Sequence, residues 1–231
     1  MKNIRPHLEK LRKVSRKKYH PLIHKLHKKH KISKKTLFYV KEYGPHSNVP
    51  RTIIKESIKI LLLASIISSF GGFALEHIKT VFVSIVPLII LMPTLNDMIG
   101  DYGTILSSKF STMLYEGKVS RSWWKNTWLR KLFVQIFIIS MFTTIMSSAL
   151  ALVISIMSGY SASIEIALKI YLICLIDVAI FVSILFLISV YAGFYFFRKK
   201  EDPNNFLIPI TTSIADFGNM IILSLLIMMF F

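Results

Sequence analysis

Sulfur and imidazole ligands are almost absent from the apolar part of this sequence. The chain has one cysteine, Cys174, and of its seven histidines only His77 lies beyond residue 46. A single cysteine excludes an intramolecular disulfide. The shortage of thiolates and imidazoles in the apolar segments excludes the ligand sets typical of zinc and copper. The carboxylates, hydroxyls, amides and carbonyls that remain are hard oxygen ligands, which suit magnesium or calcium.

Acidic residues are also few, with 12 Asp and Glu against 29 Lys and Arg, and the formal net charge is +17. The positive charge is concentrated in residues 1–52, which hold sixteen Lys or Arg and two Glu. The rest of the chain is nearly balanced and apolar, so the mean hydropathy is +0.56 overall. This composition excludes a soluble globular domain. It predicts a basic cytosolic arm with a hinge at residues 1–50 and a helical membrane domain at 51–231.

The basic arm shows a rough helical stripe of apolar residues, which Pro21 is expected to break into two short helices. We expect the arm to lie on anionic lipid headgroups, at about 1 kcal/mol per basic residue near the surface. No nucleic-acid partner is expected, because a lysine run alone is a weak signal. The arm contains four histidines, a metal-binding pattern that the surrounding positive charge opposes. They are His20, His24, His27 and His30.

Five apolar segments follow the arm, and each is long enough to cross a bilayer, which needs about 20 apolar residues per helix. The second contains Pro87 and Pro93 and is expected to be kinked or broken. The sequence therefore predicts an all-α, polytopic membrane protein with five transmembrane helices. The segments are residues 53–75, 81–114, 132–157, 164–197 and 206–231.

Positive charge in the connections predicts the orientation of the membrane domain. Lys and Arg gather in the arm, between the second and third segments, and between the fourth and fifth segments. The first connection has little charge and the third, SGYSAS, has none. Because cytosolic loops carry the excess of Lys and Arg, the N-terminus is predicted inside and the C-terminus outside. We expect a multi-pass protein of the plasma membrane.

The second segment carries the run PTLNDMIGDYGTILSSKFS, which a lipid-facing helix would not tolerate. Asp97, Asp101 and Thr104 recur at i, i+4 and i+7, so a helix places them on one face. Asn96 and Gly100 belong to an adjacent small, polar face. Backbone carbonyls freed near proline and glycine are tolerated in a membrane only where they line a cavity. We interpret these faces as the lining of a cation path; a buried hydrogen-bonded network between helices is the alternative.

The last segment carries Asp216 near its middle. A lone carboxylate at that depth costs about 2.5–3.5 kcal/mol on insertion scales, so it indicates an ion or proton site facing protein or water. Thr212 and Asn219 lie on the same helical stripe as Asp216. Asp202 followed by Pro203 is typical of an N-cap and a first helical proline, which predicts that the helix starts there.

The fourth segment carries a further acidic residue at membrane depth, Asp177. The sequence offers it no partner, because Lys169 is two helical turns away and too far for a direct pair at i, i+4. A structural pairing and a function both remain open for Asp177.

The last segment resembles the final transmembrane helix of the MgtE-type magnesium transporters and of the related animal solute-carrier magnesium transporters. The pattern that carries the resemblance is DPNN..IP.TT.I.D.G, from Asp202 to Gly218. Three earlier stretches are similar to the same membrane domain in the same order, and the resemblance covers about residues 53–231 as a single five-helix unit. These stretches are ESIKILLLASIISSFGGFAL, residues 87–112, and YEGKVSRSWWKNTWLRKLFVQI.

The resemblance implies a divalent cation channel or transporter made of two five-helix units, with the pore at their interface. One unit per chain then implies a homodimer, or a heterodimer with a paralogue. Asp216 stands where the family has its pore aspartate. Gly100 and Asp101 stand where it has Gly-Asn, so a carboxylate replaces an amide. Asp97 falls where a bacterial MgtE often has Gly, and the basic arm replaces the bacterial regulatory domains.

We therefore predict Mg²⁺ as the transported ion, held largely hydrated at a dimer interface lined by the second and fifth helices, because magnesium gives up its waters reluctantly. Two copies of Asp216 would repel each other there, and a divalent cation between them removes that repulsion. The predicted metal ligands are Asp216, Asp101 and Asp97. The predicted pore-lining residues are Asn96, Gly100, Thr104, Thr212 and Asn219, with Asp177 as a further candidate.

Two functions of other classes remain open. The chain could be a non-transporting scaffold or insertase-like factor that docks a ribosome or another partner through its basic arm. An insertase groove is expected to offer a cationic or neutral polar residue. The aspartates therefore argue against the insertase interpretation. An intramembrane aspartyl protease would need a YD/GxGD pair, which the sequence lacks, so we predict no enzymatic activity. A proton-coupled transporter that uses Asp216 or Asp177 is a variant of the leading hypothesis.

Overall fold

The computed structural model describes residues 49–119, 125–199 and 201–231. The predicted basic arm, with its four histidines and nearly all of its hinge, lies outside these residues. The described part of the chain forms helices and no strand, which confirms the predicted all-α architecture. The helices are α4 (Val49–His77), α5 (Lys79–Ser84), α6 (Val86–Tyr115), α7 (Thr127–Met157), α8 (Ile164–Arg198) and α9 (Pro203–Phe230).

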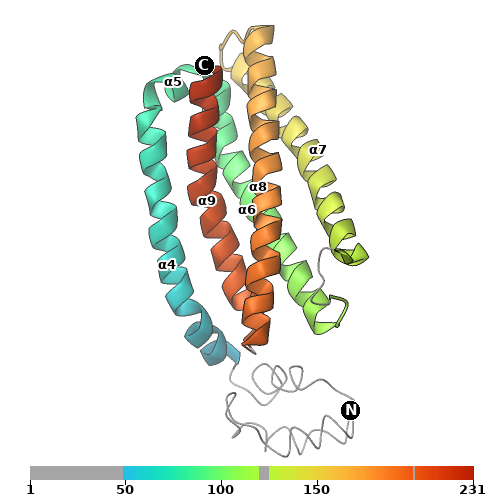
Figure 1. Cartoon of the computed structure of the whole chain (residues 1–231). Coiled ribbons are helices and arrows are strands. Elements are labelled where there is room, and N and C mark those ends of the chain that lie inside the picture. The colour runs from blue at the N-terminus through green and yellow to red at the C-terminus, as the bar shows by residue number, and fades with distance from the viewer. Residues whose placement is uncertain (1–48, 120–124, 200) are drawn as a thin grey trace, which may run out of the picture.

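The five long helices lie side by side and alternate in direction, while the short α5 crosses one end of the bundle (Figure 1). The start of α4, the α6–α7 connection and the α8–α9 connection share the opposite end, and the chain ends beside α5. The connections predicted to be cytosolic are therefore on one end of the molecule. Which end faces the cytosol stays a prediction from their charge.

Four of the described helices are long and apolar enough to cross a membrane. They are Ser57–His77 within α4, and the whole of α7, α8 and α9. The fifth long helix, α6, has 30 residues, and at 1.5 Å per residue it is about 45 Å long, more than a bilayer core requires. α6 is not one of these four apolar helices, because it carries Asn96, Asp97 and Asp101 among its apolar residues.

The outward faces of α4 and α7 are covered with large apolar side chains. Phe73 on α4 is 71% exposed, and Ile138 and Phe142 on α7 are 62% and 64% exposed. In water, contiguous apolar faces of this size would be an aggregation liability, whereas in a bilayer they meet lipid tails. Together with the four apolar helices, they show that the chain is a multi-pass membrane protein.

The core of the bundle lies where α6, α8 and α9 pack against one another. Leu95, Ile99, Val178 and Ala215 are completely buried there. Gly103 on α6 permits close approach to α9, because a Cβ at this position would lie 3.0 Å from the Cβ of Thr211. Small residues at such contacts let helices pack closely without a hydrophobic driving force from water.

The second predicted segment is divided into two helices. α5 ends at Ser84 and α6 begins at Val86, with Ile85 between them in a non-helical conformation (φ −110°, ψ 83°). Pro87 stands in the first turn of α6, where its missing N–H has no intrahelical partner to lose. Pro93 lies inside α6, which continues through it. The predicted break is therefore confirmed at the first proline, and the second does not end the helix.

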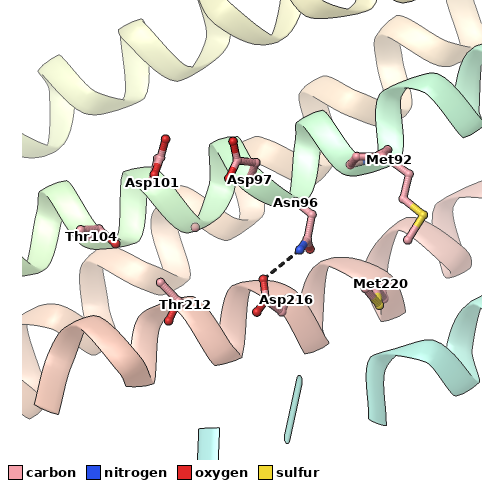
Figure 2. A pocket seen from close by; sticks show the side chains of 10 residues that line it. Met92, Asn96, Asp97, Asp101, Thr104, Thr212, Asp216 and Met220 are labelled. Atoms are coloured by element: carbon pink, nitrogen blue, oxygen red, sulfur yellow. Dashed lines mark hydrogen bonds between the residues drawn. The ribbon is translucent and has the colours of Figure 1, made fainter. Parts of the chain in front are cut away.

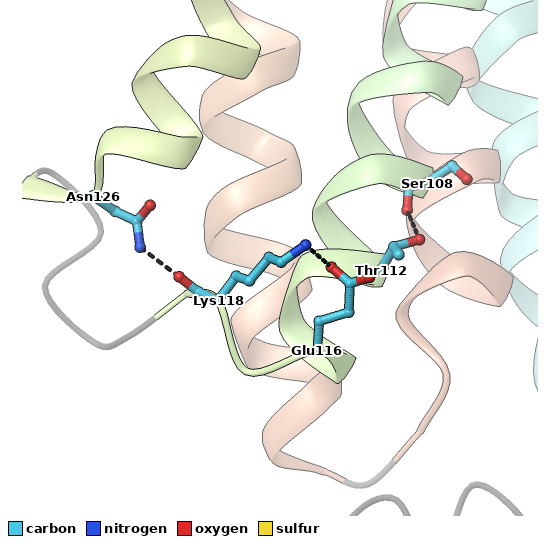
Figure 3. Close-up of polar contacts among 5 residues, drawn as sticks. All are labelled: Ser108, Thr112, Glu116, Lys118 and Asn126. Atoms are coloured by element: carbon cyan, nitrogen blue, oxygen red, sulfur yellow. Dashed lines mark hydrogen bonds and ion pairs between the residues drawn. The ribbon is translucent and has the colours of Figure 1, made fainter.

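α7 begins at Thr127, five residues earlier than its apolar pattern predicts, because Asn126 caps it. The Asn126 side-chain oxygen accepts hydrogen bonds from the backbone N–H groups of Trp128 (3.0 Å) and Leu129 (3.2 Å). Its amide also donates to the carbonyl of Lys118 at 2.8 Å, which ties the start of α7 to the end of α6 (Figure 3). The Lys118 ammonium is paired with Glu116 at 2.8 Å.

The predicted start of α9 is confirmed. The side chain of Asp202 accepts a hydrogen bond from the backbone N–H of Asn204 at 3.1 Å, and the helix begins at Pro203. This cap and proline fix the register of the helix that carries Asp216.

α4 packs mainly on α9, and Gly71 sets the closeness of that contact. A Cβ at Gly71 would lie 2.7 Å from Met220 Sδ and 3.3 Å from the Cα of Phe217. The neighbouring Gly72 faces open space, with no atom within 4 Å of such a Cβ. The two adjacent glycines therefore differ in packing while they share a helix.

We predict that Gly71→Val destabilises the protein and that Gly72→Val does not. Overpacking costs about 1–3 kcal/mol, and the loss or gain of helix propensity is the same at both positions, so the difference isolates the α4–α9 contact. Thermal unfolding of both variants in detergent measures it. Equal unfolding temperatures for the two variants would show that α4 does not dock on α9 through Gly71.

Candidate functional site

A pocket of about 460 Å³ opens between α6 and α9. Both helices contribute polar side chains to the lining of the pocket (Figure 2). Its lining includes three carboxylates and no basic side chain, so the pocket attracts cations. The lining residues are Met92, Pro93, Asn96, Asp97, Gly100, Asp101, Thr104, Thr212, Asp216 and Met220.

Asp216 is held by donors from two different helices. Asn96 Nδ2 on α6 donates to Asp216 Oδ1 at 2.8 Å, and Ser68 Oγ on α4 donates to Oδ2 at 3.1 Å. Figure 2 shows the Asn96 side chain crossing from α6 toward Asp216. A carboxylate can accept about four hydrogen bonds. The two donors therefore orient Asp216 and leave capacity on both oxygens for an ion or for its bound waters.

A second amide orients the first. Asn219 Nδ2 donates to Asn96 Oδ1 at 3.1 Å, which leaves the Asn96 amide nitrogen to face Asp216. Asn219 is completely buried and does not line the pocket. The structure therefore places this predicted pore-lining residue one step behind the site, where it supports Asn96.

Asp97 and Asp101 line the same pocket but lie at its open side. Both residues are exposed in the single chain, and Figure 2 shows their carboxylates on one side of α6, away from Asn96 and Asp216. Thr104 and Thr212, from α6 and α9, are half-buried and lie further along the pocket. Asp97, Asp101 and Thr104 share one lining, as their spacing in the sequence predicts.

The predicted metal ligands do not converge on one point in a single chain. Within residues 49–119, 125–199 and 201–231, no three acidic, histidine or cysteine side chains are grouped closely enough to hold a metal ion. Asp216, Asp101 and Asp97 instead line a common space. This arrangement fits contact with a hydrated ion, whose coordination shell is completed by water.

A separate hydroxyl network lies along α6, α8 and α9 and is fully buried. Ser107 Oγ lies 3.1 Å from Ser189 Oγ and 3.3 Å from Thr211 Oγ1. Tyr102 on α6 is likewise hydrogen-bonded to Thr143 on α7. These contacts form a buried hydrogen-bonded network between helices, at other residues than those for which the sequence left such a network open as an alternative. They lie beside the pocket rather than in its place.

Asp177 lies outside the pocket. It is completely buried on α8, and neither carboxyl oxygen has a hydrogen-bond partner among the residues that the structure describes. Lys169 does not serve it: its ammonium is paired with Glu165 at 2.8 Å and lies 5.2 Å from the ring centre of Phe231. Neither of the two interpretations left open for Asp177 is settled, although the pair with Lys169 is not formed.

Ser68 is the functional side chain that sequence reasoning missed. It lies in the run SIISSFGG, where serines read as small residues for helix packing. Its neighbour Ser69 bonds only to the carbonyl of Ser65 on its own helix, which is the usual state of such a serine in a membrane helix. The only sequence signal was the adjacent glycine pair, which marks the place where α4 approaches another backbone.

Comparison with known protein families agrees with this site. The profile of the MgtE family, described as a divalent cation transporter, matches residues 92–226, which is more than half of the chain. The chain belongs to the MgtE family of divalent cation transporters. Comparisons with curated proteins and with solved structures gave no match.

The matched range contains the whole acidic lining, from Met92 on α6 to Leu226 on α9. It confirms the resemblance on which the prediction of a divalent cation transporter rested, and MgtE is a transporter family rather than an enzyme family. The match begins after α4, so the similarity of residues 56–75 to the family's first helix stays a prediction. Ser68 accordingly lies outside the matched range.

We predict that Ser68→Ala lowers the apparent affinity of this MgtE protein for divalent cations. Removing one donor frees the Asp216 carboxylate to rotate, and a net hydrogen bond is worth about 1 kcal/mol. The divalent concentration for half-maximal flux into proteoliposomes should rise several-fold, with a smaller change at saturation. Ser69→Ala is the matched control, because Ser69 bonds only to its own helix. An unchanged half-maximal concentration in Ser68→Ala would contradict the assignment.

Proposed function

We propose that this MgtE protein conducts Mg²⁺ through a pore that two chains form together, with Asp216 as the central acidic group. The observation that carries the proposal is the Asp216 carboxylate, which lies midway along a membrane helix and faces a pocket rather than lipid. Intramembrane carboxylates in such positions mark ion pathways, because a buried one without an ion, water or donors would be too costly.

The chemistry of the pocket favours a hard, hydrated cation. Its polar atoms are carboxylate, amide and hydroxyl oxygens together with one amide nitrogen that already donates to Asp216. Magnesium prefers such oxygens and keeps most of its waters in protein sites. Six waters of about 30 Å³ each occupy on the order of 200 Å³. The pocket volume of about 460 Å³ accommodates a hydrated ion of that size.

The exposure of Asp97 and Asp101 supports a pore completed by a second copy. Two carboxylates one helical turn apart on the exposed side of a membrane helix would face lipid in a lone chain, which costs several kcal/mol. In a dimer that pairs the α6 and α9 faces, the same carboxylates would line water. A homodimer is the simplest assembly, and a heterodimer with a paralogue would satisfy the same constraint.

The proposal includes five spans, with α6 as the polar helix at the pore, the N-terminus in the cytosol and the C-terminus outside. In the plasma membrane, the membrane potential gives entering Mg²⁺ a driving force of roughly 4–5 kcal/mol for two charges at −100 mV. The scaffold or insertase alternative depends on the basic arm, which lies outside the described residues, so it stays a prediction.

We predict that wild-type protein in proteoliposomes admits Mg²⁺ to a trapped indicator and that Asp216→Asn reduces this flux at least tenfold. The substitution keeps the size and the Asn96 contact but removes the charge, and one lost interaction of about 1.4 kcal/mol already accounts for a tenfold effect. Competition by calcium, cobalt and manganese then measures selectivity.

Glu76→Gln is the matched control, because it removes a carboxylate that does not line the pocket. Glu76 lies at the end of α4, and its side chain is 71% exposed. The flux of this variant should equal that of the wild type. Folded wild-type dimers that pass none of the four ions would contradict the proposed function and would favour a binding role for the basic arm.

We predict that the exposed face of α6 meets a second copy. Ile105, two turns after Asp97 on that face, is 41% exposed, so Ile105→Cys should form a disulfide-linked dimer on mild oxidation in membranes. Disulfides need Cα atoms within about 7 Å, and the native Cys174 is buried, so the background is low. Ile138→Cys on the lipid-facing side of α7 should stay monomeric. Cross-linking at Ile138 but not at Ile105 would refute the proposed interface.

A further inference from the structure

Asp177 is buried and does not line the proposed pore. It lies near the middle of α8 and is completely buried, and its carboxyl oxygens have no donor within hydrogen-bond distance. Ser148 on α7 and Cys174, one turn earlier on α8, are also completely buried. An unpartnered carboxyl group is therefore enclosed where α8 packs against its neighbours.

No charged group of the described elements compensates Asp177. α8 packs against α6, α7 and α9, and none of the charged or titratable side chains described on these helices donates a hydrogen bond to Asp177 or forms an ion pair with it. Lys169 is paired with Glu165, and Asp216 accepts from Asn96 and Ser68. The others are Cys174, Tyr171, Tyr191, Tyr195 and Arg198 on α8, Asp97, Asp101, Tyr102, Lys109 and Tyr115 on α6, and Arg130 and Lys131 near the start of α7.

Burial of an unpaired carboxylate costs far more than burial of the neutral acid, and the group neutralises instead. Asp177 has neither a cation nor donors, and no group of metal ligands surrounds it in the described part of the chain. A proton is the cation that this position can hold without further ligands.

We propose that Asp177 is a proton-binding site, neutral in the packed bundle, that releases its proton when α8 separates from its neighbours. On release, the carboxyl O–H bond breaks and the proton passes to a water molecule that has entered the gap. The carboxylate that remains is stabilised by hydration. Proton binding at Asp177 therefore favours the packed bundle, and proton release favours an open one.

The packing of α8 on α9 connects this site to the pore. Phe181 lies one turn after Asp177 on the same face of α8, and its ring fills the space beside Gly218, 2.9 Å from where a Cβ would lie. Gly218 is two residues from Asp216. Separation of α8 from α9 at Asp177 would displace the segment that carries the pore carboxylate. This coupling step rests on the proposed function, whereas the proton site itself does not.

Infrared spectroscopy of the full chain in detergent near neutral pH tests the proton directly, because a protonated carboxyl and a carboxylate absorb at separate frequencies. The wild type and Asp216→Asn should both show the protonated-carboxyl band, and Asp177→Asn should lack it. If Asp177→Asn fails to fold, ¹³C-labelled aspartate in an Asp97→Asn/Asp101→Asn/Asp216→Asn chain leaves Asp202 as the only other labelled residue. A band that is absent from the wild type, or unchanged in Asp177→Asn, overturns the proposal.

The pH dependence of Mg²⁺ flux tests the coupling. Flux through the wild type should rise with pH, by at most about tenfold per unit for one proton, while flux through Asp177→Asn should stay nearly constant. Glu76→Gln should follow the wild-type profile. An identical pH profile in the wild type and Asp177→Asn overturns the coupling, even where the infrared band is present. Absence of flux from the wild type and from both variants contradicts the proposed function. The infrared result then decides alone whether Asp177 binds a proton.

Discussion

The arrangement of this bundle depends on holding one carboxylate, Asp216, inside an apolar helix. Three helices hold this group in place, because α9 carries it, α6 donates to it through Asn96 at 2.8 Å, and α4 donates through Ser68 at 3.1 Å. Each donor belongs to a helix that also packs closely on α9 through a glycine. Charge-assisted bonds of this kind are roughly twice as strong as neutral ones. They therefore help to fix which faces of α4 and α6 meet α9.

Small residues make this donor arrangement geometrically accessible. Gly71 lets the α4 backbone approach α9 within one turn of Ser68, and Gly103 does the same for α6 on the other side of the pocket. In lipid there is no hydrophobic gain from bringing helices together, so close packing and interhelical hydrogen bonds decide the contact. The glycines and the donors thus act together. Without the close approach, Ser68 could not reach Asp216.

Residues with short-range signals were predictable from the sequence. The spacing of Asp97 and Asp101, the Asp202 cap and the break before Pro87 follow from local rules of helix geometry, and the structure agrees with all three. The roles of Ser68 and Asn219 depend on which helices become neighbours, which one sequence does not specify. Asn219 was expected in the pore from its stripe on α9, but the approach of α6 places it behind Asn96. The early start of α7 depended on Asn126, whose cap is local but easily overlooked beside an apolar pattern.

The two carboxylates at the centre of this membrane domain differ in their surroundings, and that difference argues for two roles. Asp216 has donors on both oxygens and faces a space large enough for water, so it is placed to attract a cation. Asp177 has no donor among the described residues, which favours the neutral acid. In a bilayer the cost of an uncompensated charge is the dominant electrostatic term. In the mechanism proposed here, Asp216 is available to the ion and Asp177 binds the proton, and the helices that carry them, α9 and α8, pack against each other.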